Sequence, residues 1–459
     1  MSHYNYVVIG GGIAGVSCTE QLILEDPEST VCLVTLSSFV KTINDVTHVT
    51  QIIQSFTVSE KYYKDYTDHK QLTIKFQKAI SIEDHLHRLI CEDNSIISYD
   101  KVCVCTGGIP RLQYPKHPLI LGLRDTTSIK SFAQKLSKSR QIVIIGNGGI
   151  ANELVYEISN CNIIWCIKDK SLNAAFFEED AGNFLLHHVN RKREYSLKHT
   201  RFATSNSIET TETGCALGPD WKTDFSLEGN SASESLVLEK ECLVIDISCN
   251  EQSSEWPLTV KLSNGKNYQC DFVVSATGVT PLTDCVSATL NRGPDGGLLI
   301  NDQMQTSATD VYAAGDVCSP NWQLSPLWFQ MRLWTQARQM GMYAAHCMAT
   351  NKKGEAALLD ISFELFTHST NFFGFKIVLL GLYNNQNIPK EECEILVRCT
   401  PSVEYIKVIL RNSRMQGAIL IGETDLEETF ENLILNQLDL SHVKDSLLDP
   451  NIDIDDYFD

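Results

Sequence analysis

Two glycine-rich turns of nearly the same shape constrain the fold of this chain more than any other feature. The first lies in "YVVIGGGIAGVSCTEQL", where Gly10, Gly12 and Gly15 complete a GxGxxG spacing between an apolar strand and a helical run. The second lies in "IVIIGNGGIANELVYEI", which has the same spacing with an alanine in the third position. In this strand–turn–helix context, backbone N–H groups at the helix N-terminus can hold a pyrophosphate. The pattern predicts two dinucleotide-binding domains in one chain.

We expect the turn residues and their helical neighbours to bind two different dinucleotides. The predicted residues are Gly10, Gly12, Ile13, Ala14 and Gly15 in the first turn, and Gly146, Gly148, Gly149 and Ile150 in the second. A nicotinamide and a flavin are the natural pair, because one delivers a hydride and the other holds two electrons and can release them singly. The repeated turn therefore predicts a flavoprotein that takes electrons from NAD(P)H.

Composition excludes several other classes of protein. The 459 residues carry a formal net charge of −19, which argues against binding to nucleic acid or to an anionic membrane surface. No apolar run approaches the length of a membrane span, and the first apolar run lacks the basic flank of a signal peptide. The 16 cysteines are scattered through apolar segments, as in reduced cytosolic or nuclear proteins. We predict no metal site.

Three further motifs identify a family. "CVCTGGIP" (residues 103–110) and "SATGVTP" (275–281) stand where the chain would cross between domains, and "TSATDVYAAGDVC" (306–318) resembles a flavin-binding motif. In these motifs the sequence is similar to the two-dinucleotide flavoproteins, also called pyridine nucleotide-disulfide oxidoreductases. The resemblance implies that Asp316 binds the ribityl or pyrophosphate part of FAD. It adds Thr106, Gly107, Gly278, Gly315 and Val317 to the predicted cofactor-binding residues.

The resemblance implies an α/β fold with two Rossmann-like domains and a C-terminal α+β domain. FAD would be bound by residues 1–124 and 277–346, and NAD(P)H by residues 125–276, with a polar insertion at about 178–256. Residues 347–459 would form the C-terminal domain and end in an acidic tail. Residues 326–348 predict one helix whose N-terminus points at the flavin.

Two local patterns in the C-terminal part predict where its elements begin. The run "ISFELFTH" (361–368) is typical of a strand, as are four later runs. Thr424 and Glu427 have the spacing of a capping box for a helix with Leu426, Phe430 and Leu433 on its buried face.

The sequence departs from its family where disulfide chemistry would take place. Residues 36–53, where relatives carry reactive cysteines, contain none, and no pair has the CxxC spacing. Cys103 and Cys105 point to the same face of a strand at a separation that disfavours a disulfide. Lys41 stands near the position at which relatives carry the reactive cysteine. It is either a cation beside the reactive edge of the flavin or an ordinary loop lysine.

At three positions the sequence does not decide how the chain would contact the nucleotides. Thr35 stands where many relatives have a glutamate for the adenosine ribose. Lys168 and Asp169 follow the second strand of the other domain, so a phosphate-binding base and a ribose-binding acid occur side by side. Glu153 matches a position that faces nicotinamide and flavin in several relatives, or else it is a surface helix residue.

The expected function is FAD-dependent oxidation of NAD(P)H, with oxygen or another molecule as the final acceptor. The alternative is a nucleotide-gated binding module, whose reduced-flavin complex with NAD(P)+ is recognised by a protein partner with little turnover. The resemblance implies association with the tRNA-splicing ligase complex of cytoplasm and nucleus, which the chain would protect from oxidation.

Overall fold

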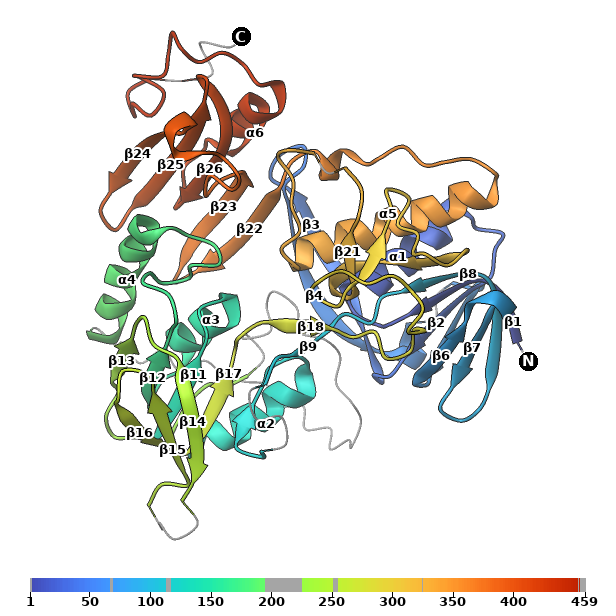
Figure 1. The fold of residues 1–459 in the computed structure, drawn as a ribbon, viewed down its shortest axis with the longest axis horizontal. Coiled ribbons are helices and arrows are strands. Elements are labelled where there is room, and N and C mark those ends of the chain that lie inside the picture. The colour runs from blue at the N-terminus through green and yellow to red at the C-terminus, as the bar shows by residue number, and fades with distance from the viewer. Residues whose placement is uncertain are drawn as a thin grey trace.

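The computed structural model describes residues 2–66, 69–112, 117–194, 225–250, 255–323, 325–452 and 454. Figure 1 shows an N-terminal domain in blue and orange, a central domain in cyan to yellow-green, and a C-terminal domain in red. The predicted polar insertion and acidic tail lie partly outside the described residues. Among the helices of the described part of the chain, none is long and apolar enough to cross a membrane.

The N-terminal domain is built around a mainly parallel sheet. Its strand order is β5-β2-β1-β8-β7-β6, and β20 pairs with the C-terminal end of β8. The strands are β1 (Ser2–Ile9), β2 (Val31–Thr35), β5 (Leu72–Phe76), β6 (Ala79–Glu83), β7 (Arg88–Cys91), β8 (Ile96–Val104) and β20 (Val311–Ala313). Val7 and Val8 in β1 are fully buried, as expected for a parallel strand covered on both faces.

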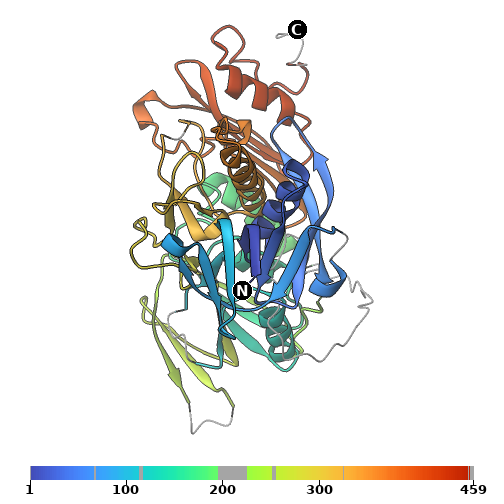
Figure 2. The same cartoon turned by 90° about the vertical axis from the view of Figure 1, so that its right-hand side faces the viewer.

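Helices α1 (Ile13–Glu25) and α5 (Trp334–Lys352) lie side by side on this sheet, although they are far apart in sequence (Figures 1 and 2). A Cβ on Gly341 of α5 would lie 2.2 Å from the carbonyl oxygen of Ala14 in α1. Only glycine therefore permits this helix contact. A hairpin of β3 (Phe39–His48) and β4 (Gln54–Tyr62) extends from the domain toward the C-terminal domain.

The central domain carries the second parallel sheet, with strand order β10-β17-β11-β12-β13. Its strands are β10 (Ile120–Leu121), β11 (Gln141–Ile145), β12 (Asn162–Cys166), β13 (Leu236–Glu239) and β17 (Phe272–Ser275), with helices α2 (Thr126–Leu136), α3 (Gly149–Glu157) and α4 (Glu179–Glu194). An antiparallel sheet of β14 (Val244–Cys249), β15 (Leu258–Leu262) and β16 (Asn267–Cys270) is attached to it. The predicted polar insertion at about 178–256 thus contains α4, β13 and β14.

Two short strand pairs lie outside these sheets, and one of them is at the link between the first two domains. Strands β9 (Gly108–Pro110) and β18 (Val279–Pro281) pair where the chain crosses between them, and β19 (Leu298–Ile300) pairs with β21 (Cys318–Pro320). Both crossings follow the glycine-containing motifs predicted to stand there.

The C-terminal domain is an antiparallel sheet with helix α6 (Glu427–Asn436) on one face. The strand order is β22-β23-β26-β25-β24, formed by β22 (Thr367–Phe372), β23 (Phe375–Gly381), β24 (Glu394–Thr400), β25 (Glu404–Arg411) and β26 (Arg414–Ile421). Phe430 and Leu433 are buried as predicted, whereas Leu426 is half-buried.

Three predicted element boundaries are wrong. The helix expected over residues 326–348 begins only at Trp334, and the strand expected over 361–368 is a 3₁₀ turn at Ile361–Phe363 followed by a strand from Thr367. The predicted capping box does not cap α6, which begins at Glu427 after Leu426 without a side-chain cap.

Candidate functional site

The first glycine turn joins β1 to α1 and is shaped by close backbone contacts. Gly10 has φ +121°, and a Cβ there would lie 2.2 Å from the carbonyl oxygen of Cys105. A Cβ on Gly15 would lie 1.8 Å from the carbonyl oxygen of Gly10. Helix α1 begins after Gly12 without a side-chain cap and without an acidic residue in its first turn. Its first N–H groups can therefore bind an anion.

The second turn repeats this construction between β11 and α3. Gly146 has φ +129°, and a Cβ there would lie 2.1 Å from the carbonyl oxygen of Ala276. A Cβ on Gly148 would meet nothing within 4 Å, because this residue borders open space. Helix α3 also begins without a side-chain cap or an acidic first turn.

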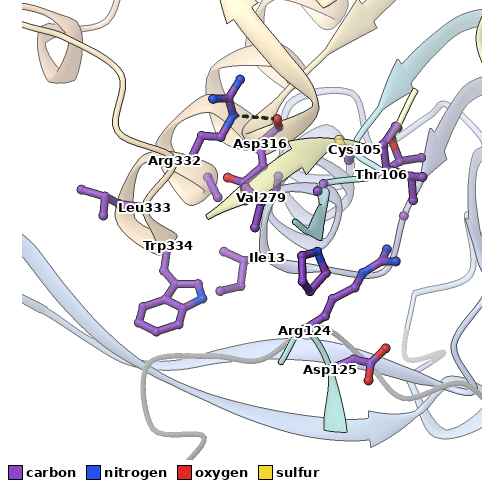
Figure 3. Close-up of a pocket in the computed structure, with 18 of the residues that line it drawn as sticks. Ile13, Cys105, Thr106, Arg124, Asp125, Val279, Asp316, Arg332, Leu333 and Trp334 are labelled. Atoms are coloured by element: carbon purple, nitrogen blue, oxygen red, sulfur yellow. Dashed lines mark hydrogen bonds between the residues drawn. The ribbon is translucent and has the colours of Figure 1, made fainter. Parts of the chain in front are cut away.

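Both turns open into one cavity of about 680 Å³. Its wall combines segments of all three domains, and part of it is shown in Figure 3. The predicted residues that line it are Gly10, Gly12, Ile13, Ala14, Thr35, Thr106, Gly107, Gly148, Gly149, Ile150, Glu153, Gly278 and Asp316. The predicted residues outside its lining are Gly15, Lys41, Gly146, Lys168, Gly315 and Val317. Gly15, Gly146 and Gly315 are closely packed, since a Cβ on each would approach another atom within 2.9 Å.

Lys41 is buried on β3 rather than exposed on a loop. Its side-chain nitrogen lies 2.9 Å from a carboxylate oxygen of Glu60 on β4. The cation is thus held by the hairpin. Its predicted role beside a flavin stays a prediction.

The two segments that follow the second strand of each domain differ in how their polar groups are held. Thr35 bonds within its own turn, since its hydroxyl oxygen accepts the N–H of Ser37 at 3.2 Å. In the central domain Lys168 is exposed, whereas Asp169 accepts a 3.0 Å hydrogen bond from the side chain of Asn147 in the glycine turn. The acid is therefore oriented beside the turn that would hold the nicotinamide nucleotide.

Asp316 lines the cavity from a 3₁₀ turn (Gly315–Val317) that precedes β21. Burial raises the pKa of its carboxyl, and the positive charge of Arg332 opposes that shift. The Arg332 side chain donates from Nε to the backbone oxygen of Asp316 at 3.0 Å, as Figure 3 shows. The carboxylate of Asp316 is left to face the cavity, where a hydroxyl donor of a ligand would stabilise it.

The cavity wall includes residues that no motif identified. Figure 3 shows Arg124 and Trp334 among them. His368 of β22 is buried, its ring stacks on Phe176 at 6.0 Å between centroids, and burial lowers its pKa to about 4. Phe372 approaches the second glycine turn, 3.5 Å from where a Cβ of Gly149 would lie. These residues lie outside the predicted cofactor-binding motifs, and the fold brings them together at one wall.

The described cysteines are all free thiols. Cys105 and Cys285 line the cavity, and both are buried. The sulfurs of Cys103 and Cys105 lie 3.5 Å apart within hydrogen-bonding distance and are not bonded to each other. Among the described residues, no group of three or more His, Cys, Asp or Glu side chains could hold a metal ion.

Comparison with known sequences gives relatives along the whole chain. The sequence is 44% identical over 495 residues to pyridine nucleotide-disulfide oxidoreductase domain-containing protein 1 of Homo sapiens, covering 99% of this chain and 98% of that protein. The protein of the same name in Dictyostelium discoideum is 34% identical, with 99% of each chain covered.

Solved structures with the same fold are distant in sequence. Putidaredoxin reductase in its covalent complex with putidaredoxin has a TM-score of 0.69 at 16% identity, with 96% of this chain and 94% of that chain covered. The water-forming NADH oxidase of Lactobacillus brevis bound to NADH has a TM-score of 0.68 at 14% identity, with 99% and 95% covered.

Family models match in the same order as the domains. The C-terminal domain of rubredoxin NAD+ reductase matches residues 368–438, and the pyridine nucleotide-disulphide oxidoreductase model matches residues 4–193 and 238–341. The two uncapped glycine turns, the open space at Gly148 and the desolvated carboxyl of Asp316 fit the cofactors of such proteins, FAD and NAD(P)H. The chain belongs to the pyridine nucleotide-disulphide oxidoreductase family.

Proposed function

We propose that this protein is an FAD-dependent NAD(P)H oxidoreductase that works without a disulfide relay. The observation that carries the proposal is the single cavity lined by both glycine turns. Two dinucleotides bound at these turns would extend into the same space, where their reactive rings can meet. Holding two reactants in one orientation removes much of the entropic cost of their encounter.

The chain's own residues would bind, orient and shield the reactants. The first turn would hold the pyrophosphate of FAD and the second that of NAD(P)H, each on the free N–H groups of a helix. Trp334 places the N-terminus of α5 at the cavity wall, where the helix dipole favours negative charge. Phe176, His368 and Phe372 close the wall with rings that exclude water. When bound, the flavin supplies the redox chemistry by accepting a hydride from the nicotinamide.

The absence of a cysteine in residues 36–53 supports an acceptor other than a disulfide. That segment contains strand β3 and the paired Lys41 in place of a reactive thiol. Oxygen or another small or protein acceptor would then take the electrons directly from the cofactor site.

The test is anaerobic reduction of the purified protein by NADH or NADPH, followed by admission of oxygen. We expect flavin absorbance in the protein as isolated, its bleaching by reduced nicotinamide and its return with oxygen. Gly148→Val is expected to keep the flavin but prevent bleaching, whereas Gly12→Val is expected to lose the flavin. The two variants serve as each other's controls. A colourless protein that does not bind added FAD would contradict the proposal.

The family resemblance also supports a protective role beside the tRNA-splicing ligase complex in cytoplasm and nucleus. In this setting slow turnover and a persistent reduced form, recognised by the partner, would matter more than rapid oxidation of NAD(P)H. Co-purification of the ligase with the wild type but not with Gly148→Val would support a nucleotide-gated partner role. Rapid steady turnover with oxygen, without association with the ligase, would contradict the partner role and support the oxidoreductase activity alone.

A further inference from the structure

A cysteine and a histidine meet on the surface of the central domain, away from the lining of the cofactor cavity. Cys249 is the last residue of β14, and His117 precedes β10. The Nε2 atom of His117 lies 2.8 Å from the Sγ atom of Cys249, although the two residues are 132 positions apart in sequence. Neither residue lines the cavity.

The backbone fixes which ring nitrogen of His117 carries the hydrogen. The N–H of Leu119 donates to Nδ1 of His117 at 3.2 Å, so Nδ1 acts as an acceptor. In a neutral imidazole the other nitrogen then carries the hydrogen, and Nε2–H is directed at the sulfur of Cys249. An imidazole N–H directed at the sulfur places this exposed thiol in the polar setting in which cysteines react as nucleophiles.

Cys399 provides a natural comparison in the same molecule. Among the described cysteines only Cys249 and Cys399 are exposed. Cys399 lies on the edge strand β24, where partial burial and then the negative charge of Glu404 raise the pKa of its thiol. The two exposed thiols therefore differ in two ways: Cys249 has an imidazole N–H at its sulfur, and Cys399 lies beside a negative charge.

We propose that Cys249 and His117 form a thiol-modification site that reacts with small peroxides. The sulfur attacks one oxygen of hydrogen peroxide, so that an S–O bond forms and the O–O bond breaks. The sulfur is oxidised by two electrons to a sulfenic acid, and the departing hydroxide takes the thiol proton and leaves as water. The site acts independently of the cofactor cavity. It gives the proposed oxidoreductase a surface thiol that peroxide oxidises.

The test compares the two exposed cysteines of the full-length protein. Limiting N-ethylmaleimide, and in a second series hydrogen peroxide followed by dimedone, are applied at neutral pH, and each cysteine is quantified by peptide mass spectrometry. We expect Cys249 to react about tenfold or more faster than Cys399, since of the two only Cys249 has an imidazole N–H directed at its sulfur. His117→Ala is expected to remove this advantage and leave the rate at Cys399 unchanged.

The comparison within the wild type needs no variant and can overturn the proposal even if His117→Ala does not fold. Equal reaction rates of Cys249 and Cys399 in the wild type would overturn it. So would an undiminished rate at Cys249 in a folded His117→Ala protein.

Discussion

Arg124 brings a positive charge to the wall of the cofactor cavity. Its side chain is directed toward the part of the wall that contains Cys105 and Thr106 (Figure 3). Burial lowers the pKa of its guanidinium, and within the described part of the chain the guanidinium has no hydrogen-bond or ion-pair partner. A half-buried cation of this kind is stabilised when an anionic ligand binds.

We therefore expect Arg124→Gln to weaken the binding of FAD. One lost charge-assisted hydrogen bond, worth about 1.5–3 kcal/mol, corresponds to a dissociation constant raised about tenfold or more. Titration of the apoprotein with FAD, followed by quenching of flavin fluorescence, measures this constant. Arg111→Gln is the matched control, because Arg111 is exposed and does not line the cavity. Equal affinity in both variants would show that Arg124 does not contact the cofactor.

His368 should make the stability of the protein depend on pH. Burial lowers the pKa of its imidazole from 6.5 to about 4, so protonation favours the unfolded chain. The stabilisation is complete above the ordinary pKa and is lost as the pH falls toward 4. Between about pH 7.5 and about pH 5 the free energy of unfolding should fall by about 2 kcal/mol on account of this residue.

Urea unfolding of the apoprotein at the two pH values measures this contribution. The decrease in stability should be about 2 kcal/mol smaller in His368→Asn than in the wild type. His442→Asn is the control, since His442 is exposed in the same domain and should leave the decrease unchanged. If stability decreased as much in His368→Asn as in the wild type, the imidazole would be protonated without unfolding the protein.

Among the elements, those with a strong local signal were predictable and those shaped by distant contacts were not. The two glycine turns were correctly predicted because φ values such as +121° at Gly10 exclude other residues locally. The start of α5 was not correctly predicted. The side chain of Gln336 accepts the N–H of Met331 at 2.8 Å and donates to the oxygen of Phe329 at 2.8 Å, which holds the preceding segment extended.

The same reasoning applies to the wall of the cavity. Glu153, Asp316 and glycines such as Gly12 and Gly148 belong to motifs with fixed spacing, and the structure places them around one space. His368 and Phe372 belong to an ordinary-looking strand, and they reach the cavity only because the C-terminal sheet packs against the other domains. Their contribution depends on tertiary contacts that no short pattern encodes.

At the scale of the whole molecule, the C-terminal domain is fixed in place by the tip of the β3–β4 hairpin. Ile52 and Ile53 are buried in the core of the C-terminal domain. Glu431 of α6 is 1% exposed, accepts a hydrogen bond from the hydroxyl of Thr50 and lies 3.2 Å from the N–H of Ile52. The strand that carries His368 therefore depends on this contact for its position over the cavity.

Removing the carboxylate should loosen this docking without changing either glycine turn. Glu431→Ala leaves the hydroxyl of Thr50 and the N–H of Ile52 without their buried acceptor, at a cost of about 2–4 kcal/mol. We expect faster hydrogen exchange in β22 and weaker protection of bound flavin from solvent quenchers, while FAD still binds. Glu428→Ala on the exposed face of the same helix should change neither measurement. If exchange in β22 were the same in both variants, the hairpin contact could not be what positions the C-terminal wall, and the packing of Phe176 and Phe372 would have to hold it instead.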